Sequence, residues 1–356
     1  MVRTVAKASL KKENNKPKTA RRSRRRREGV TLQDVANLAG VSMITVSRAI
    51  NTPDRVKPDT LEIVKAAIKK SGYVPNVLAG GLASSRTRMF AAIVPTISNM
   101  TFSKTMHSFS KSVRTAGYQV LFTESGFEIE NEEELVYAIL ARRPDGLMLT
   151  GVNHSKEVRN MILSSGIPTV ETGDLTQTPL DYVVGCSQYR LGEAVGQLFL
   201  KRGFTKVGLV TADNSRAKER AKGLLDTLAH HDNIQITEHT VGSPTTLRCG
   251  RDGLGSLIEK GFTEGAIFCT SDTVAHGVLV EAHARGIIIP DQMSVIGMGD
   301  EEWTPDTHPS LSTVRIDRDL IGEKAAEILL KRVEGEDAGD HVVDLGFEIV
   351  LRGSLV

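Results

Sequence analysis

The first ordered stretch of the chain alternates apolar and polar residues with the period of a helix. In the segment 31–50, "TLQDVANLAGVSMITVSRAI", the spacing i, i+3, i+4, i+7 predicts a short amphipathic helix. Thr31 and Asp34 are expected to form a capping box at its start, and Gly40 to end it. Its inward face comprises Leu32, Val35, Ala36 and Ala39.

Two further helices follow at short intervals. Ser42 can cap a second helix, and a third is predicted over 58–71, between Pro58 at a first-turn position and Gly72. Two short helices joined by a glycine-containing turn are typical of a helix-turn-helix, whose second helix enters the DNA major groove. In the second helix the period buries Val46, Ala49 and Ile50 and turns outward Met43, Ile44, Ser47 and Arg48.

From residue 89 onward, apolar runs alternate with helical patterns. This alternation predicts an α/β fold with parallel sheets covered by helices on both faces. The runs divide near residue 188 into two halves of similar content, so we expect two Rossmann-like doubly wound subdomains with a ligand cleft between them. The expected strands are "MFAAIVPTI", "YQVLFTES", "GLMLTG", "IPTVETG", "YVVGC", "KVGLVTA", "QITEHTV", "GAIFCTS", "SVIGMG" and "STVRI".

Polar residues follow several of these strands, at the sheet edge where ligands of such folds bind. Taken singly, each is better explained as a solvated loop residue. Taken together, they predict a polar cleft suited to a sugar or another polyol. They include Thr96, Asn99, Thr150, His154, Glu171, Asp174, Gln188, Asp213, Asp272 and Asp300.

The formal net charge of +2 over 356 residues conceals a strong asymmetry. Residues 1–28 carry twelve Lys or Arg against two Glu, or +10, which leaves 33 basic and 41 acidic residues, or −8, for the rest. A tail this charged and this poor in apolar residues is expected to be disordered. It is either a solubilising arm or a non-specific contact to DNA phosphates.

Other functional classes find little support. Three distant cysteines favour neither a disulfide framework nor a zinc site. A signal peptide, a membrane span and the common phosphate-binding and nucleophile motifs are not recognisable. The chain is therefore expected to be cytoplasmic, without enzymatic activity, cofactor, metal site or membrane partner.

"TLQDVANLAGVSMITVSRAIN" together with "GYVPN" (72–76) resembles the DNA-binding head of the lactose/galactose repressor family. The resemblance implies a helix-turn-helix domain over 29–75, a hinge helix over 76–86, and a periplasmic-binding-protein-like core over 87–356 whose chain crosses between subdomains near 188 and 316. The residues expected to contact DNA are Thr31, Leu32, Ser42, Met43, Ile44, Thr45, Ser47, Arg48, Asn51, Arg55, Tyr73, Asn76, Ala79 and Leu82.

The hinge segment "NVLAGGLASS" (76–85) combines a helical leucine spacing with two adjacent glycines. In the family Leu82 matches an apolar wedge that enters the minor groove at the operator centre. Gly80 and Gly81 weaken the helix, so we expect it to form only when DNA and a partner hinge supply contacts.

Four core motifs resemble the gluconate operon repressors within this family: "DGLMLT....H" (145–154), "PTVE" (168–171), "IFCTSD" (267–272) and "DLGFEI" (344–349). They imply a sugar-acid effector whose carboxylate meets Arg220 or Lys218, with Asp272 as a hydroxyl acceptor. The acids of "GMGDEEW" (297–303) would repel such a carboxylate. The expected effector residues are Thr96, Asn99, Phe102, Thr150, His154, Glu171, Arg220, Asp272 and Asp300.

The combined expectation is a homodimeric transcriptional repressor of carbohydrate or sugar-acid genes. It would bind a pseudo-palindromic operator, because a two-fold symmetric dimer repeats its contacts in both half-sites. Release of DNA on effector binding is favoured over tighter binding.

Overall fold

The computed structural model describes residues 29–75, 86–97, 100–126 and 129–355. It divides into two units, Met1–Ser85 and Arg86–Val356. The basic tail expected over 1–28 and nearly all of the expected hinge, 76–85, lie outside the described residues.

The N-terminal unit has the three helices that the sequence predicts. They are α1 (Leu32–Ala39), α2 (Met43–Asn51) and α3 (Pro58–Ser71), with a 3-10 turn, η1 (Pro53–Arg55), before the last. The capping box is present: the Thr31 side chain accepts from the Asp34 amide, and the Asp34 carboxylate accepts from the Thr31 amide at 2.8 Å. Gly40 and Gly72 end α1 and α3 in the left-handed conformation, at φ 66° and 68°. These predictions are confirmed.

A small apolar core holds the three helices together. Its fully buried members alternate with exposed residues at helical spacing, so each helix contributes one face. They are Val35, Ala36, Val46, Ala49, Val64 and Ala67.

The first half of the core is a six-stranded parallel sheet in the order β11-β5-β4-β3-β1-β2. Successive residues of β1 point to opposite faces: Phe90 packs with α5 and α12 residues, whereas Ala91 packs with α6 and α7 residues. The strands are β1 (Met89–Val94), β2 (Gln119–Glu124), β3 (Gly146–Thr150), β4 (Thr169–Thr172), β5 (Tyr182–Gly185) and β11 (Val342–Asp344). The helices are α5 (Met100–Thr115), α6 (Ile129–Leu140), α7 (Lys156–Ser165) and α12 (Arg318–Val333).

The second half repeats this plan with the order β12-β10-β9-β8-β6-β7, in which only β12 runs antiparallel to its neighbour. Its strands are β6 (Lys206–Ala212), β7 (Gln235–Val241), β8 (Gly265–Cys269), β9 (Met293–Met298), β10 (Ser312–Arg315) and β12 (Glu348–Val350). Its helices are α8 (Gln188–Lys201), α9 (Ser215–Leu228), α10 (Leu247–Glu259), α11 (Asp272–Ala284) and the 3-10 turn η2 (Thr304–Asp306).

All ten expected strands are present, and the doubly wound two-subdomain core is confirmed. The sequence does not predict β11 and β12, because each is only three residues long and too short to show a period. Among the described residues, no helix is both long and apolar enough to cross a membrane.

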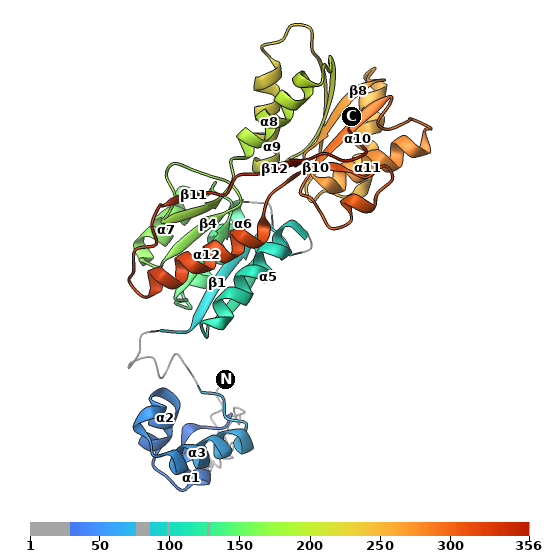
Figure 1. The fold of residues 1–356 in the computed structure, drawn as a ribbon. Coiled ribbons are helices and arrows are strands. Elements are labelled where there is room, and N and C mark those ends of the chain that lie inside the picture. Colours follow the sequence, from blue (N-terminus) through green and yellow to red (C-terminus); the bar gives the residue numbers. More distant parts are fainter. Residues whose placement is uncertain (1–28, 76–85, 98–99, 127–128, 356) are drawn as a thin grey trace, which may run out of the picture. The chain divides into compact units, whose positions relative to one another are not determined.

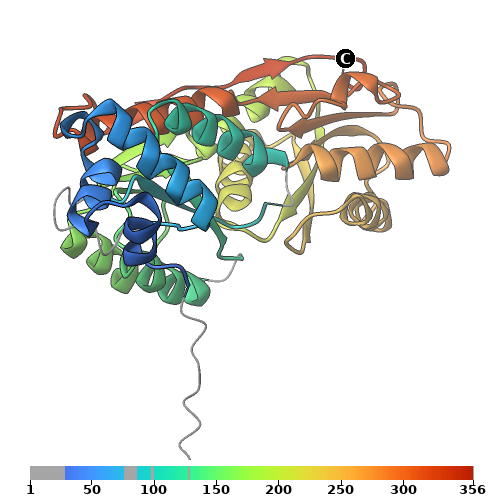
Figure 2. The same cartoon turned by 90° about the horizontal axis from the view of Figure 1, so that it is seen from below.

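The chain passes between the two halves three times. The passages lie between β5 and α8, between β10 and α12, and between β11 and β12. Figures 1 and 2 both show the C-terminal segment (red) running from the first half of the core to the second. The third passage, over 345–347, was not expected from the sequence.

Helices α8 and α9 approach each other so closely that glycine is required at the contact. A methyl group added at Gly192 would lie 1.9 Å from the carbonyl oxygen of Arg220, and one added at Gly223 would lie 2.0 Å from that of Tyr189. No side chain fits at such distances. The contact fixes the position of α9, which carries two residues of the site described next.

Candidate functional site

The outward face of α2 exposes apolar side chains at the helix N-terminus. Ser42 Oγ accepts from the Thr45 amide at 3.2 Å and so caps the helix. Met43 and Ile44 are 46% and 64% exposed, and Arg48 is exposed as well. The outward orientation predicted for these three residues is confirmed.

The other residues expected to contact DNA have mixed surroundings. Leu32 and Tyr73 are partly buried against the apolar core of the head. Asn51 donates to Ser47 Oγ at 3.3 Å, and Arg55 is exposed in η1. The last three, Asn76, Ala79 and Leu82, lie outside the described residues.

A pocket lies at the carboxyl ends of the core strands, between the two halves. It contains about 940 Å³ of empty space, part of it open to solvent. Three of the nine expected effector residues line it: Phe102, Thr150 and Arg220. Its lining, among the described residues, includes three arginines and no carboxylate.

Arg220 lies on α9 and is only 7% exposed. Its guanidinium donates to Gln188 Oε1 and, at 2.9 Å, to the carbonyl oxygen of Thr270. Both partners are neutral, and Nε has no partner among the described atoms. Burial and the neighbouring charge of Arg216 both lower the pKa of Arg220, which still remains cationic at neutral pH. An anion that enters the pocket would stabilise this charge.

Arg216 lies one turn earlier on the same helix and was not singled out from the sequence. Its guanidinium is 4.8 Å from the ring centroid of Phe102, a cation–π contact that fixes its position. Burial lowers its pKa as well. The sequence did hold a signal, because Arg216 and Arg220 are spaced i, i+4, which places both on one face of a helix.

Arg318, the third arginine, is the first residue of α12 and is 5% exposed. Its Nη1 pairs with Glu301 Oε1 at 2.9 Å, while Nη2 is buried without a hydrogen-bond partner among the described residues. Lys218, the alternative to Arg220, instead pairs with Asp213 at 2.5 Å and is 64% exposed outside the lining.

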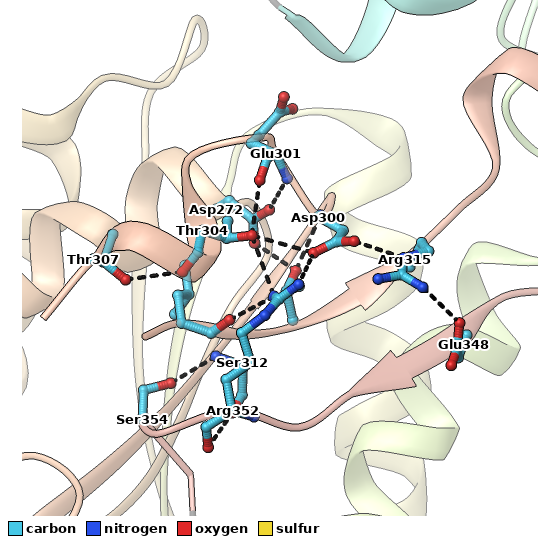
Figure 3. Close-up of polar contacts among 12 residues, drawn as sticks. Asp272, Asp300, Glu301, Thr304, Thr307, Ser312, Arg315, Glu348, Arg352 and Ser354 are labelled. Carbon is cyan, nitrogen blue, oxygen red and sulfur yellow. Dashed lines mark hydrogen bonds and ion pairs between the residues drawn. The ribbon is translucent and has the colours of Figure 1, made fainter. Parts of the chain in front are cut away.

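Asp272 lies outside the lining and uses its carboxylate within the protein. Its Oδ1 accepts from Thr313 Oγ1 at 2.6 Å. Its Oδ2 accepts from the Glu301 amide at 3.0 Å (Figure 3). Burial raises its pKa to about 6 despite these hydrogen bonds. The structure thus engages both carboxylate oxygens of Asp272 within the protein and places the residue outside the lining, in contrast to the role expected from its motif.

The acids of "GMGDEEW" are also neutralised from within. Asp300 pairs with Arg315 at 2.6 Å and with Arg352 at 2.7 Å, and Arg315 extends the network to Glu348 (Figure 3). Burial raises the pKa of Asp300, but the bonds from the two arginines outweigh it and leave the pKa lowered. Glu301 is likewise paired to Arg318. The expectation that Asp300 and Glu301 repel an effector carboxylate is therefore wrong, because arginines neutralise both acids.

His154, Glu132 and Glu171 form a buried cluster in the first half, called here the histidine brace. His154 Nδ1 lies 2.8 Å from Glu132 and Nε2 lies 3.3 Å from Glu171, whose other oxygen accepts from the Leu180 amide at 2.6 Å. Burial alone would lower the pKa of His154, but the two glutamates raise it to about 9. The brace lies outside the lining, so both side chains hold the loops behind the pocket.

The last two expected effector residues differ in how they can be placed. Thr96 donates to Glu124 Oε1 at 3.3 Å and lies outside the lining. Asn99 lies outside the described residues.

Comparisons with known proteins agree with both parts of the chain. Residues 31–76 match the model of bacterial regulatory proteins of the lacI family, and residues 197–355 match a periplasmic binding protein-like domain. The HTH-type transcriptional regulator GntR of Pseudomonas aeruginosa is 34% identical over 91% of this chain and 95% of its own.

Two solved structures share the fold over nearly the whole chain. A lacI-family transcriptional regulator from Silicibacter pomeroyi superposes with a TM-score of 0.85 at 31% identity, covering 91% of this chain and 99% of its own. The lac repressor dimer bound to operator and the anti-inducer ONPF superposes with a TM-score of 0.79 at 23% identity, covering 92% and 99%.

Proposed function

The chain belongs to the lacI family of bacterial regulatory proteins, DNA-binding transcriptional regulators with an effector-binding core, and from this premise we propose that it represses sugar-acid utilisation genes. A homodimer in the cytoplasm would bind a pseudo-palindromic operator. A sugar acid bound in the pocket would release the homodimer from the operator.

The observation that carries the effector class is the buried guanidinium of Arg220 in a lining without carboxylates. A carboxylate forms short, charge-assisted hydrogen bonds with a guanidinium, and these are stronger than bonds between neutral groups. The lining also offers hydroxyl and amide groups to a polyol, among them Thr150, Thr172 and Asn214. A polyhydroxylated carboxylic acid matches both features.

On the DNA side, the exposed side chains of Met43 and Ile44 would contact thymine methyl groups, and Arg48 would read the O6 and N7 atoms of guanine. A dimer is supported by the shared fold with the lac repressor, which was solved as a dimer on its operator. Each operator half-site would then receive one head.

Coupling between pocket and DNA needs only a modest energy. An effector that changes the arrangement of the two halves alters how the dimer holds its hinge segments, and such couplings amount to about 1 to 3 kcal/mol. The three passages of the chain between the halves are the places where this movement would be absorbed.

A gel-shift titration on promoter DNA, repeated with aldonic acids and with the matching neutral sugars, tests the proposal. We expect an aldonic acid to release the DNA and the neutral sugars to have little effect. Tighter DNA binding in the presence of the acid would refute induction, and release by neutral sugars alone would refute the effector class.

Arg48→Ala separates specific from non-specific binding. It should lose about 1 to 3 kcal/mol of discrimination between the operator and random DNA, because phosphate contacts elsewhere are retained. Fluorescence anisotropy on both DNAs measures the difference. Equal losses on the two DNAs would show that Arg48 contacts phosphate rather than bases.

A further inference from the structure

The pocket holds more positive charge than one carboxylate can balance. Arg318 is ion-paired to Glu301. Among the described residues, neither Arg216 nor Arg220 forms a hydrogen bond or ion pair with a carboxylate. In the part of the chain that the structure describes, two guanidinium charges therefore line the pocket without a contact to an opposite charge.

Asp174, an acid close enough to act on both arginines electrostatically, does not fill this role. Its carboxylate accepts from the backbone amides of Leu175 at 2.8 Å and Gln188 at 3.2 Å, and it lies outside the lining. Burial raises its pKa, and the two backbone hydrogen bonds oppose this shift. The pocket itself therefore leaves room for a negative charge on the ligand beside the arginines.

Unmet hydrogen bonds point the same way. Arg220 and Arg318 are both more than nine-tenths buried. Arg220 Nε and Arg318 Nη2 have no hydrogen-bond partner among the described atoms. A buried donor without an acceptor costs stability, so each position favours an acceptor oxygen on the ligand. The two donors belong to different elements, α9 and the start of α12.

Two helices add positive potential at the same place. The N-cap residues of α9 and α11, Asn214 and Ser271, both line the pocket. A helix N-terminus carries roughly half a positive charge and favours anions. The two helix N-termini thus add to the positive charge of the arginines, although Asp272 in the first turn of α11 offsets part of that helix's contribution.

Resting on the proposed function, we propose that the effector carries two anionic groups, a carboxylate and a second group such as a terminal phosphate, and that Arg216 binds the second. The class is a phosphorylated sugar acid. The cation–π contact with Phe102 holds Arg216 in place for this role.

The test compares ligands that differ by one charged group. Calorimetry on the full chain would use a panel of aldonic acids, their terminal phosphates and the neutral sugars, with gluconate, 6-phosphogluconate and glucose as the first set. We expect the phosphorylated acid to bind at least about tenfold more tightly than the unphosphorylated acid, as one added charge-assisted contact implies.

Variants on α9 assign this gain to one side chain. Arg216→Gln should reduce the preference for the phosphorylated acid to about threefold or less, and Arg216→Lys should restore part of it. Lys218→Gln is the matched control, because Lys218 is two residues away on the same helix but exposed outside the pocket. It should leave the preference unchanged.

The outcomes separate this inference from the proposed function. If no phosphorylated acid binds more tightly than its unphosphorylated counterpart, or if Arg216→Gln weakens both equally, the second anionic group is refuted while the sugar-acid effector stands. If neutral sugars bind as tightly as both acids, the sugar-acid effector itself fails.

Discussion

The two halves of the core differ in the charge that they bring to one pocket. The first half supplies mainly uncharged groups, among them Phe102, Met106 and Thr150, together with Arg318 at the start of α12. Helix α9 of the second half supplies Arg216 and Arg220 beside uncharged groups. These three arginines, the arginine wall, would hold the charges of an anionic polyol and so orient it between the two halves.

The halves also differ in how they neutralise the acids behind the pocket. In the first half, Glu132 and Glu171 share one histidine, whose charge depends on pH. In the second half, Asp300 and Glu301 are paired with arginines, which stay charged at any pH the protein meets. Strand-end acids thus need not indicate ligand contacts, and the acids of the two halves have partners that respond differently to pH.

The largest expected effect comes from a substitution that displaces α9, the helix that carries Arg216 and Arg220. Gly223→Ala would place a methyl group 2.0 Å from the Tyr189 carbonyl oxygen and force α8 and α9 apart. We expect a loss of about 3 kcal/mol or more in the free energy of unfolding, since overpacking of this kind cannot be relieved by a rotamer change. Denaturant titration measures it. Gly242→Ala, where the methyl group would meet nothing within 4 Å, is the control, and similar losses in both variants would contradict the close contact.

A second prediction concerns the pH at which His154 loses its proton and the histidine brace of the first half loses its ion pairs. The pKa of His154 is raised from 6.5 to about 9, so its stabilising contribution is complete below pH about 6.5 and is lost as the pH rises through about 9. The shift corresponds to roughly 3 kcal/mol. Denaturant titrations at pH 7 and 9.5 should show this loss in the natural chain. His154→Gln should be less stable at pH 7 and show little further loss. An unchanged pH dependence in the variant would place the titrating group elsewhere.

The arginine wall is tested by replacing Arg220, whose guanidinium is buried at the pocket. Arg220→Gln should weaken aldonic acid binding by about 100-fold, because one buried charge-assisted contact is lost and Gln188 and Thr270 lose their donor. Calorimetry with the acid and the matching neutral sugar measures the change. Lys218→Gln again serves as the control. A loss of less than about threefold would exclude Arg220 as the anion site.

The smallest effect is expected in the network of Figure 3. Asp300→Asn removes the negative partner of Arg315 and Arg352 and should cost about 2 kcal/mol of stability. The pKa of Asp300 is lowered, so its contribution is present above the ordinary carboxyl range and fades only in acid. The cost should therefore be equal at pH 7 and 9.5. A loss of stability in Asp300→Asn that differs between pH 7 and 9.5 would contradict the predicted contrast with His154.

The parts of the fold that local pattern governs were predictable. Helix caps at Thr31 and Ser42, the ends at Gly40 and Gly72, and ten of the strands depend on neighbouring residues and on a period that the sequence displays. Strands β11 and β12 are too short to carry such a period, and their place is set by pairing with β5 and β10 far away in the chain.

The site was predictable in position but less so in its members. Parallel strands bring their carboxyl ends together, which places the pocket, and Arg220 was found through its motif. Which acids face a ligand depends on partners distant in sequence, such as Thr313 for Asp272 and Arg352 for Asp300. No local pattern encodes these pairs. Arg216 could have been found, since it precedes Arg220 by one helical turn.

The central claim is that the arginine wall receives an anion of the effector. Calorimetry of the full chain with an aldonic acid and its matching alditol tests this most directly, because the two open-chain ligands differ mainly in one carboxylate. We expect the acid to bind at least about tenfold more tightly than the alditol and the difference to disappear in Arg220→Gln. Equal affinities, or a difference that survives this substitution, would contradict it.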